Sequence, residues 1–99
     1  SSYELDTVSF TELRAVLRIL KRNKEVSIKV IGHTDNNGSK ISNKILSVQR
    51  CLAVKQFLVK HGILNNRIKI EGKGDSDPLL PNTTDDNRIK NRRVEFRVI

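Results

Sequence analysis

The sequence predicts a single α/β domain, a two-layer α+β sandwich in which two main helices pack on a mixed sheet. Three observations support this prediction. The chain has 99 residues, a length that suits one domain. Two stretches repeat apolar residues at helical spacing, and three shorter stretches alternate apolar and polar residues as half-buried strands do. The stretches follow one another in the order (β)-α-β-α-β-β, which is typical of a sheet covered by helices.

The chain opens with a short mixed segment that leads into the first predicted helix. Residues 3–5 are interpreted as the end of a truncated first strand, because we expect the chain to be one domain, residues 1–99, excised from a larger protein. Ser9 and Glu12 have the spacing of a capping box. The helix predicted at about residues 9–23 then carries apolar residues on one face: Phe10, Leu13, Val16, Leu17 and Leu20.

A strand and a longer helix come next. Apolar and polar residues alternate over residues 26–30, which predicts a strand that ends at Gly32. Residues 33–42 are polar and rich in Asn, Gly and Ser, as loops are. Residues 43–61 contain no Gly or Pro and predict a second helix, closed by Gly62 at the position of a left-handed cap.

The rest of the chain is predicted to add two strands separated by a long loop. Residues 67–71 alternate as a strand does, and residues 73–87 hold both prolines and several Asp and Asn, as loops do. Residues 87–92 are interpreted as a short helical turn. A final strand is predicted at residues 93–99, with three side chains on the core face: Val94, Phe96 and Val98.

The charge of the chain narrows the classes of partner without choosing among them. Lys and Arg total 19 against 11 Asp and Glu, a formal net charge of +8 at pH 7. This balance favours acidic partners such as nucleic acid, anionic lipid or a carboxylate-rich polymer. The basic residues are scattered, so most are expected on a solvated surface. No apolar run approaches the roughly 18 residues of a membrane span, and we expect no direct membrane insertion.

Patterns for catalysis and metal binding are weak in this sequence. Cys51 is the single cysteine, and its place on an apolar helix face predicts a buried, inert thiol rather than a nucleophile paired with His33. His33 and His61 are too few and too far apart for a zinc signature. No nucleotide-binding glycine pattern or complete calcium loop is present. We therefore expect no enzyme activity, no metal and no cofactor.

A polar cluster follows the strand that ends at Gly32, formed by His33, Thr34 and Asp35. Such residues line the mouth of a pocket beyond a strand's carboxyl end, or they cap backbone groups of the loop. Arg50 lies close to the apolar face of the second helix, where an unpaired charge is costly. Asp35 could form a structural salt bridge with Arg50. Alternatively, the two could flank a gap and bind the ammonium and carboxylate of a zwitterion, such as an amino-acid headgroup.

Three motifs together give the chain a family resemblance. They are GHTD at residues 32–35, NxxLSxxR at residues 43–50 and NRRVE at residues 91–95. With other matched positions they run in order from about residue 9 to residue 99, and at these separations they are jointly a strong signal. The chain resembles the OmpA-like C-terminal domain, also found in MotB-type motor proteins and peptidoglycan-associated lipoproteins. Cys51 departs from the pattern by replacing the usual Ala, which should affect packing only.

The resemblance implies a function and a set of site residues. It implies non-covalent binding of peptidoglycan through the diaminopimelate residue of the peptide stem. In the family, the Asp of GHTD and the Arg of LSxxR bind the amino-acid headgroup of that residue, and these positions are Asp35 and Arg50 here. The family pattern also brings five further residues to the pocket: Asn43, Leu46, Arg93, Thr34 and Asn37.

The resemblance also implies where the domain works. It implies a periplasmic domain that anchors an outer-membrane or other envelope protein of a Gram-negative cell to the cell wall, with a membrane-associated parent protein. The alternative is a basic nucleic-acid-binding domain, prompted by the net charge. The sequence lacks the clustered basic stripe and the aromatic platform that such domains use. We therefore expect peptidoglycan, and no nucleic acid, as the partner.

Overall fold

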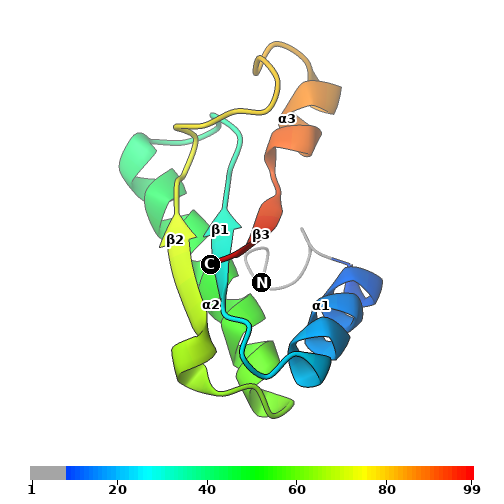
Figure 1. Ribbon diagram of the computed structural model, residues 1–99. Helices are drawn as coiled ribbons and strands as arrows, with labels where there is room; N and C mark the ends of the chain where they lie inside the picture. The colour runs from blue at the N-terminus through cyan, green and yellow to red at the C-terminus, as the bar shows by residue number, and fades with distance from the viewer. Residues whose placement is uncertain (1–8) are drawn as a thin grey trace.

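The computed structural model describes residues 9–99 (Figure 1). The strand expected at residues 3–5 lies outside the described residues. The remaining elements follow in the predicted order: α1 (Phe10–Arg22), β1 (Ile28–Gly32), α2 (Lys40–Lys60), a 3-10 turn η1 (Asn65–Arg67), β2 (Ile68–Gly72), α3 (Asp85–Asn91) and β3 (Val94–Val98). None of the helices in this part of the chain is long and apolar enough to cross a membrane.

The three strands form one mixed sheet in the order β2-β1-β3. β1 and β2 are parallel, and their register pairs Gly32 with Gly72 at their carboxyl ends. β3 is antiparallel to β1 and pairs Val94, at its amino end, with the same Gly32. The predicted mixed sheet is therefore confirmed. Because of this topology, the segments after β1 and β2 and the segment before β3 all meet at one edge of the sheet.

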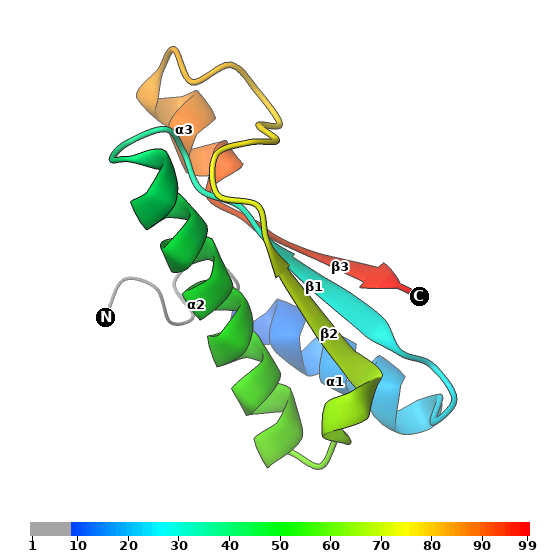
Figure 2. The ribbon, with the colours of Figure 1, turned by 90° about the vertical axis from the view of Figure 1, so that its left-hand side faces the viewer.

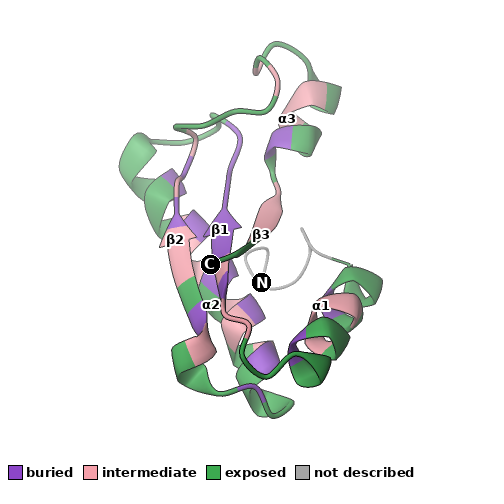
Figure 3. Ribbon diagram, viewed as in Figure 1, coloured by how far each residue is buried: buried purple, intermediate pink, exposed green. Residues whose placement is uncertain are grey.

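The helices cover the sheet and enclose the core. Figure 2 shows α2 running along one face of the sheet. Figure 3 shows the buried residues concentrated in β1 and on the parts of α1 and α2 that face it. Aliphatic side chains from both helices and from the strands make up this core: Leu13, Leu20, Ile28, Val30, Val54, Leu58, Ile63 and Ile68. This is the two-layer arrangement that the apolar spacing predicts.

Two glycines allow α2 to lie directly against the ends of the parallel strands. A Cβ added at Gly32 would lie 2.6 Å from the backbone oxygen of Ser47 and 2.9 Å from Sγ of Cys51. A Cβ added at Gly72 would lie 2.6 Å from Oγ of Ser47. These separations are shorter than van der Waals contact, so a side chain at either position would push the helix away from the sheet.

Local capping explains where the helices begin. Oγ of Ser9 accepts a hydrogen bond from the backbone N–H of Glu12 at 3.1 Å, which confirms the predicted start of α1. The second helix begins at Lys40, earlier than the predicted Asn43, because Oγ of Ser39 accepts from the backbone N–H of Ser42 at 3.0 Å. Sequence periodicity alone missed this turn, since its residues are exposed, including its one apolar side chain, Ile41, which is 76% exposed.

Three other boundaries or orientations differ from prediction. The first strand begins at Ile28, because the N–H of Val26 is used in a turn to the carbonyl of Asn23. The short third helix begins at Asp85, ahead of the predicted residue 87, because Thr84 caps it. Val98 was predicted on the core face, but it is 69% exposed. The helix layer packs mainly on β1 and β2, so the end of β3 lies beyond its cover.

Candidate functional site

Backbone hydrogen bonds tie together the segments that meet at the carboxyl ends of β1 and β2. Each of these bonds joins two elements that are distant in sequence: Lys73 N to Gly32 O (2.9 Å), Thr34 N to Gly74 O (2.8 Å) and His33 N to Arg93 O (2.9 Å). The side chain of Ser47 on α2 joins this set, because its Oγ accepts from the N–H of Gly74 at 2.9 Å. The loops at this edge are therefore held rigidly against one another and against α2.

Thr34 and Asp35 are buried immediately after β1, and both cap backbone groups. Oγ1 of Thr34 donates to the carbonyl of Asp35 at 2.9 Å. One carboxylate oxygen of Asp35, Oδ1, accepts from the N–H of Asn37 at 2.9 Å. The capping interpretation of this cluster is thus confirmed for both residues. The other oxygen of Asp35, Oδ2, lies 3.4 Å from Nε of Arg92 and remains able to accept further hydrogen bonds.

Arg50 reaches the same loop from α2. The residue is only 4% exposed, and its Nη1 donates to the carbonyl oxygen of His33 at 3.4 Å. Its guanidinium therefore lies against the segment that carries Asp35 two residues later. The structural salt bridge considered for Asp35 and Arg50 is not formed. Within residues 9–99, the ion pair of Asp35 is with Arg92.

Two further predicted residues lie in the first half of α2. Asn43 is buried, and among the described residues its amide nitrogen Nδ2 has no hydrogen-bond partner. A buried donor left without an acceptor costs about 1–3 kcal/mol, so this nitrogen is a candidate donor to a ligand oxygen. Leu46 is half-buried, whereas Asn37 is exposed in the loop before the helix.

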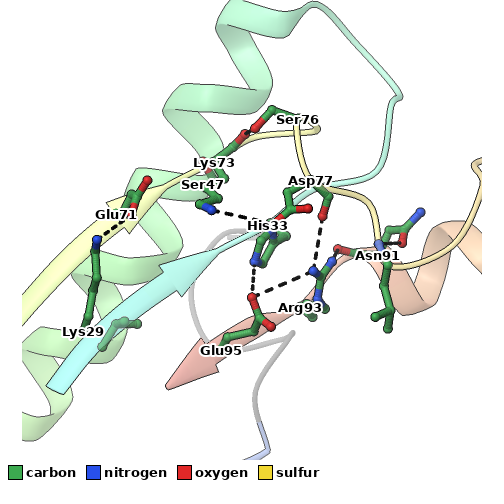
Figure 4. A network of polar contacts seen from close by, with 12 residues as sticks. Lys29, His33, Ser47, Glu71, Lys73, Ser76, Asp77, Asn91, Arg93 and Glu95 are labelled. Carbon is green, nitrogen blue, oxygen red and sulfur yellow. Dashed lines mark hydrogen bonds and ion pairs between the residues drawn. The ribbon is translucent and has the colours of Figure 1, made fainter. Parts of the chain in front are cut away.

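Arg93 is held by acceptors on neighbouring segments of the chain, as Figure 4 shows for Asp77 and Glu95. Its Nη2 lies 3.2 Å from the backbone oxygen of Asp77 and 3.8 Å from Oε1 of Glu95, and its Nη1 lies 3.4 Å from the backbone oxygen of Asn91. The guanidinium is thus already engaged by three acceptors at this edge. Sequence reasoning selected Arg93 from the NRRVE motif, but it is Arg92 that contacts Asp35.

A buried histidine joins Arg93 to β1. Nε2 of His33 lies 2.5 Å from Oε1 of Glu95, the carboxylate that also contacts Arg93 (Figure 4). Burial lowers the pKa of His33 below its ordinary value of 6.5, although the hydrogen bond to Glu95 acts in the opposite direction. Sequence reasoning placed His33 in the polar cluster but did not pair it with Glu95. The pairing depends on β3 lying beside β1, which no local pattern encodes.

The asparagine of NRRVE has a structural role. Asn91 is fully buried, and its side chain makes four hydrogen bonds to the loop before α3. Its Oδ1 accepts from the N–H groups of Leu79 (2.8 Å) and Leu80 (3.0 Å), and its Nδ2 donates to Leu80 O and Asn82 Oδ1 (both 2.8 Å). This residue therefore fixes the loop that borders the site.

The chemistry available at this edge is recognition of charged groups. A carboxylate, arginine guanidiniums and an amide donor lie on neighbouring segments, a set that matches a ligand carrying both an ammonium and a carboxylate. Among residues 9–99, no three His, Cys, Asp or Glu side chains are grouped to hold a metal ion. Cys51 is fully buried as predicted, and burial raises the pKa of its thiol to about 11, so it stays protonated near neutral pH.

Comparisons with known proteins agree with the fold and the motifs. The model of the OmpA family matches residues 1–92. The chain is 42% identical over 73 residues, 74% of its length, to outer membrane protein A of Bordetella avium, covering 38% of that protein. It is 38% identical over 86 residues, 87% of its length, to the peptidoglycan-binding protein ArfA of Mycobacterium bovis, covering 26% of that protein.

The fold is shared with a solved structure. The crystal structure of the peptidoglycan-associated lipoprotein from Burkholderia pseudomallei superimposes with a TM-score of 0.92, covering 100% of this chain and 84% of that one. The two sequences are 22% identical, so this similarity shows the fold alone. That fold is the predicted α/β architecture. The chain spans less than half the length of the curated relatives that it matches.

Proposed function

This chain belongs to the OmpA family, and from that premise we propose that it binds peptidoglycan non-covalently through the diaminopimelate residue of the peptide stem. In doing so it anchors an envelope protein to the cell wall from the periplasm. Relatives that are named as outer membrane proteins and as a peptidoglycan-binding protein support this assignment. The function is binding without catalysis, and it requires no cofactor or metal.

The observation that carries the proposal is the convergence of Asp35 and Arg50 on one loop. Asp35 is 6% exposed and keeps a carboxylate oxygen available beside Arg92, while Arg50 approaches the carbonyl of His33 from α2. In the bound state, Asp35 receives the ammonium of the free diaminopimelate end and Arg50 binds its carboxylate. The unsatisfied Nδ2 of Asn43 is a further donor for a ligand oxygen.

Removing either charge should abolish most binding to insoluble peptidoglycan sacculi. Each of Asp35→Ala and Arg50→Ala removes a charge-assisted contact of about 1.5–3 kcal/mol, a loss of roughly 10- to 150-fold in affinity. Glu25→Ala and Arg18→Ala are matched controls, because they change the net charge equally at exposed positions outside the site. Co-sedimentation with sacculi measures the effect, and circular dichroism verifies folding. If both site variants sediment like the wild type, the site is assigned wrongly.

Stem peptides that contain diaminopimelate should bind more tightly than those that contain lysine. A diaminopimelate end offers an ammonium and a carboxylate on one carbon, whereas a lysine side chain offers the ammonium alone. The lysine peptide lacks the carboxylate that Arg50 would bind, and the loss of this charge-assisted contact should weaken binding about tenfold or more. Calorimetry with the two peptides at matched salt tests this. Equal affinities would mean that Arg50 does not read the ligand carboxylate.

A salt titration separates this proposal from the nucleic-acid alternative. Binding of a basic protein to nucleic acid weakens steeply with salt, because each neutralised phosphate releases counterions. Contact with one zwitterion at a buried site involves few counterions and should weaken much less. Sacculus binding that persists from low to physiological salt, with no measurable retention of a DNA duplex, is the expected result.

A further inference from the structure

One segment of the chain carries positive charge without any negative charge. Residues 36–70 contain no Asp or Glu, although the chain has 11 in total, and they contain seven cationic residues: Lys40, Lys44, Arg50, Lys55, Lys60, Arg67 and Lys69. This segment includes the whole of α2 and η1. A surface built from it attracts anionic partners and repels cationic ones.

A groove lies on this segment, away from the candidate peptidoglycan site. It has a volume of about 410 Å³ and lies between the last turns of α2 and η1, lined by Leu52, Lys55, Gln56, Val59, Lys60 and Asn65. The first four of these follow at i, i+3, i+4 and i+7, which places them on one face of the helix. Leu52 is 41% exposed and Val59 is 39% exposed, whereas Val54 and Leu58 on the other face are fully buried.

The groove combines an apolar floor with a cationic rim. Leu52 and Val59 contribute the aliphatic surface, and Lys55 and Lys60 stand beside them. Neither lysine has an ion-pair partner among residues 9–99. An aliphatic side chain seated on the floor would be flanked by two ammonium groups able to pair with carboxylates.

We propose that this groove docks an acidic segment of a partner protein, one that presents an aliphatic side chain flanked by Asp or Glu. A second copy of this chain fits poorly, because two faces of the same positive sign would meet and the chain carries a net charge of +8. An anionic lipid surface fits poorly as well, because the apolar residues line a hollow rather than project from it.

The groove and the peptidoglycan site can be occupied together. Arg50 and Leu52 are only two residues apart along α2, but with about 3.6 residues per turn they lie about 200° apart around the helix axis. Arg50 is buried against the loop after β1, whereas Leu52 is 41% exposed on the groove face. The domain can therefore hold the cell wall on one face of α2 and an acidic protein segment on the other.

Selection from a random peptide library on the immobilised chain tests this proposal. We expect enriched peptides to combine an aliphatic residue with neighbouring Asp or Glu. The double variant Lys55→Glu/Lys60→Glu should weaken the best peptide at least tenfold in fluorescence anisotropy. The matched control Arg14→Glu/Arg18→Glu makes the same charge change on exposed positions of α1 and should leave affinity unchanged. Sacculus binding should be unchanged in Lys55→Glu/Lys60→Glu.

Four outcomes would overturn the proposal. They are a selection without acidic–aliphatic enrichment, enriched peptides that bind Lys55→Glu/Lys60→Glu as tightly as the wild type, and an equal loss in Arg14→Glu/Arg18→Glu. The fourth is binding to phosphatidylglycerol vesicles that depends on Lys55 and Lys60, because it would make the face a membrane contact.

Discussion

The two halves of α2 bury very different side chains. In the first half the buried residues are Asn43, Ser47 and Arg50, all polar or charged. In the second half, after Cys51, they are Val54 and Leu58. Both halves are one continuous helix, so the difference lies in what each half packs against. The first half meets the loops beyond the strands, and the second half meets the sheet.

This difference separates recognition from stability within a single helix. The polar half is held by hydrogen bonds to backbone groups, such as Arg50 to the carbonyl of His33 and Gly74 N to Ser47. The apolar half contributes the burial that stabilises the fold, at about 25 cal/mol for each Å² removed from water. Changes in the second half should therefore alter unfolding, and changes in the first half should alter binding.

The largest effect is expected from the apolar half. Leu58→Ala removes a fully buried side chain from the core and should lower the free energy of unfolding by about 3 kcal/mol, because a cavity remains. Urea denaturation measures this loss. Sacculus binding, measured well below the unfolding midpoint, should match that of the wild type. A binding loss in fully folded Leu58→Ala would show that the two halves are coupled.

A substitution in the polar half should have a smaller effect on the free energy of unfolding and should instead weaken binding. Asn43→Ala removes the buried Nδ2 that has no partner within the described residues and adds no volume at this packed position. The free energy of unfolding should change by less than about 1 kcal/mol, because no formed hydrogen bond of that nitrogen is lost. Affinity for sacculi should fall about tenfold, since a donor to the ligand is removed. A variant that is destabilised but binds sacculi like the wild type would show that Asn43 serves stability rather than binding.

The smallest expected effect on the free energy of unfolding comes from His33, a buried residue just after β1 whose carbonyl contacts Arg50 of α2. Because burial lowers the pKa of His33, the folded state favours its neutral form. The free energy of unfolding should therefore fall as the pH drops below the unfolded pKa of about 6.5, and should be insensitive to His33 above it. The groups facing His33 are Glu95 in β3, Arg93 just before it and Asp77 in the loop between β2 and α3.

Urea denaturation between pH 5 and pH 8 measures this dependence. The His33→Gln variant should lose part of the slope, whereas His61→Gln, at an exposed position, should keep it. Identical slopes in the wild type and His33→Gln would contradict the expectation. Staying above pH 5 keeps most carboxylates ionised, so that their titration does not dominate the result.

The sequence by itself determined the order of elements, the core and the motifs. Apolar spacing along α1 and α2 and alternation in the strands are local signals, because side-chain direction repeats with the backbone period. The sequence predicted the first residues of α2 and α3 less accurately, because each helix start is set by one capping side chain, Ser39 or Thr84. The positions of Asp35 and Arg50 near one another followed from the motifs and from the expected place of the loop after β1.

Only the tertiary structure decided which charged groups meet at the site. The strand order β2-β1-β3 brings the NRRVE segment beside the loop after β1, and so Arg92 contacts Asp35 while Arg93 and His33 share Glu95. The tertiary structure also leaves Val98 exposed, although the alternation of apolar and polar residues predicted Val98 on the core face with Val94 and Phe96. The physical reason is the same in each case. Pairing between strands and the reach of the helix layer depend on contacts between residues distant in sequence, and no local period records them.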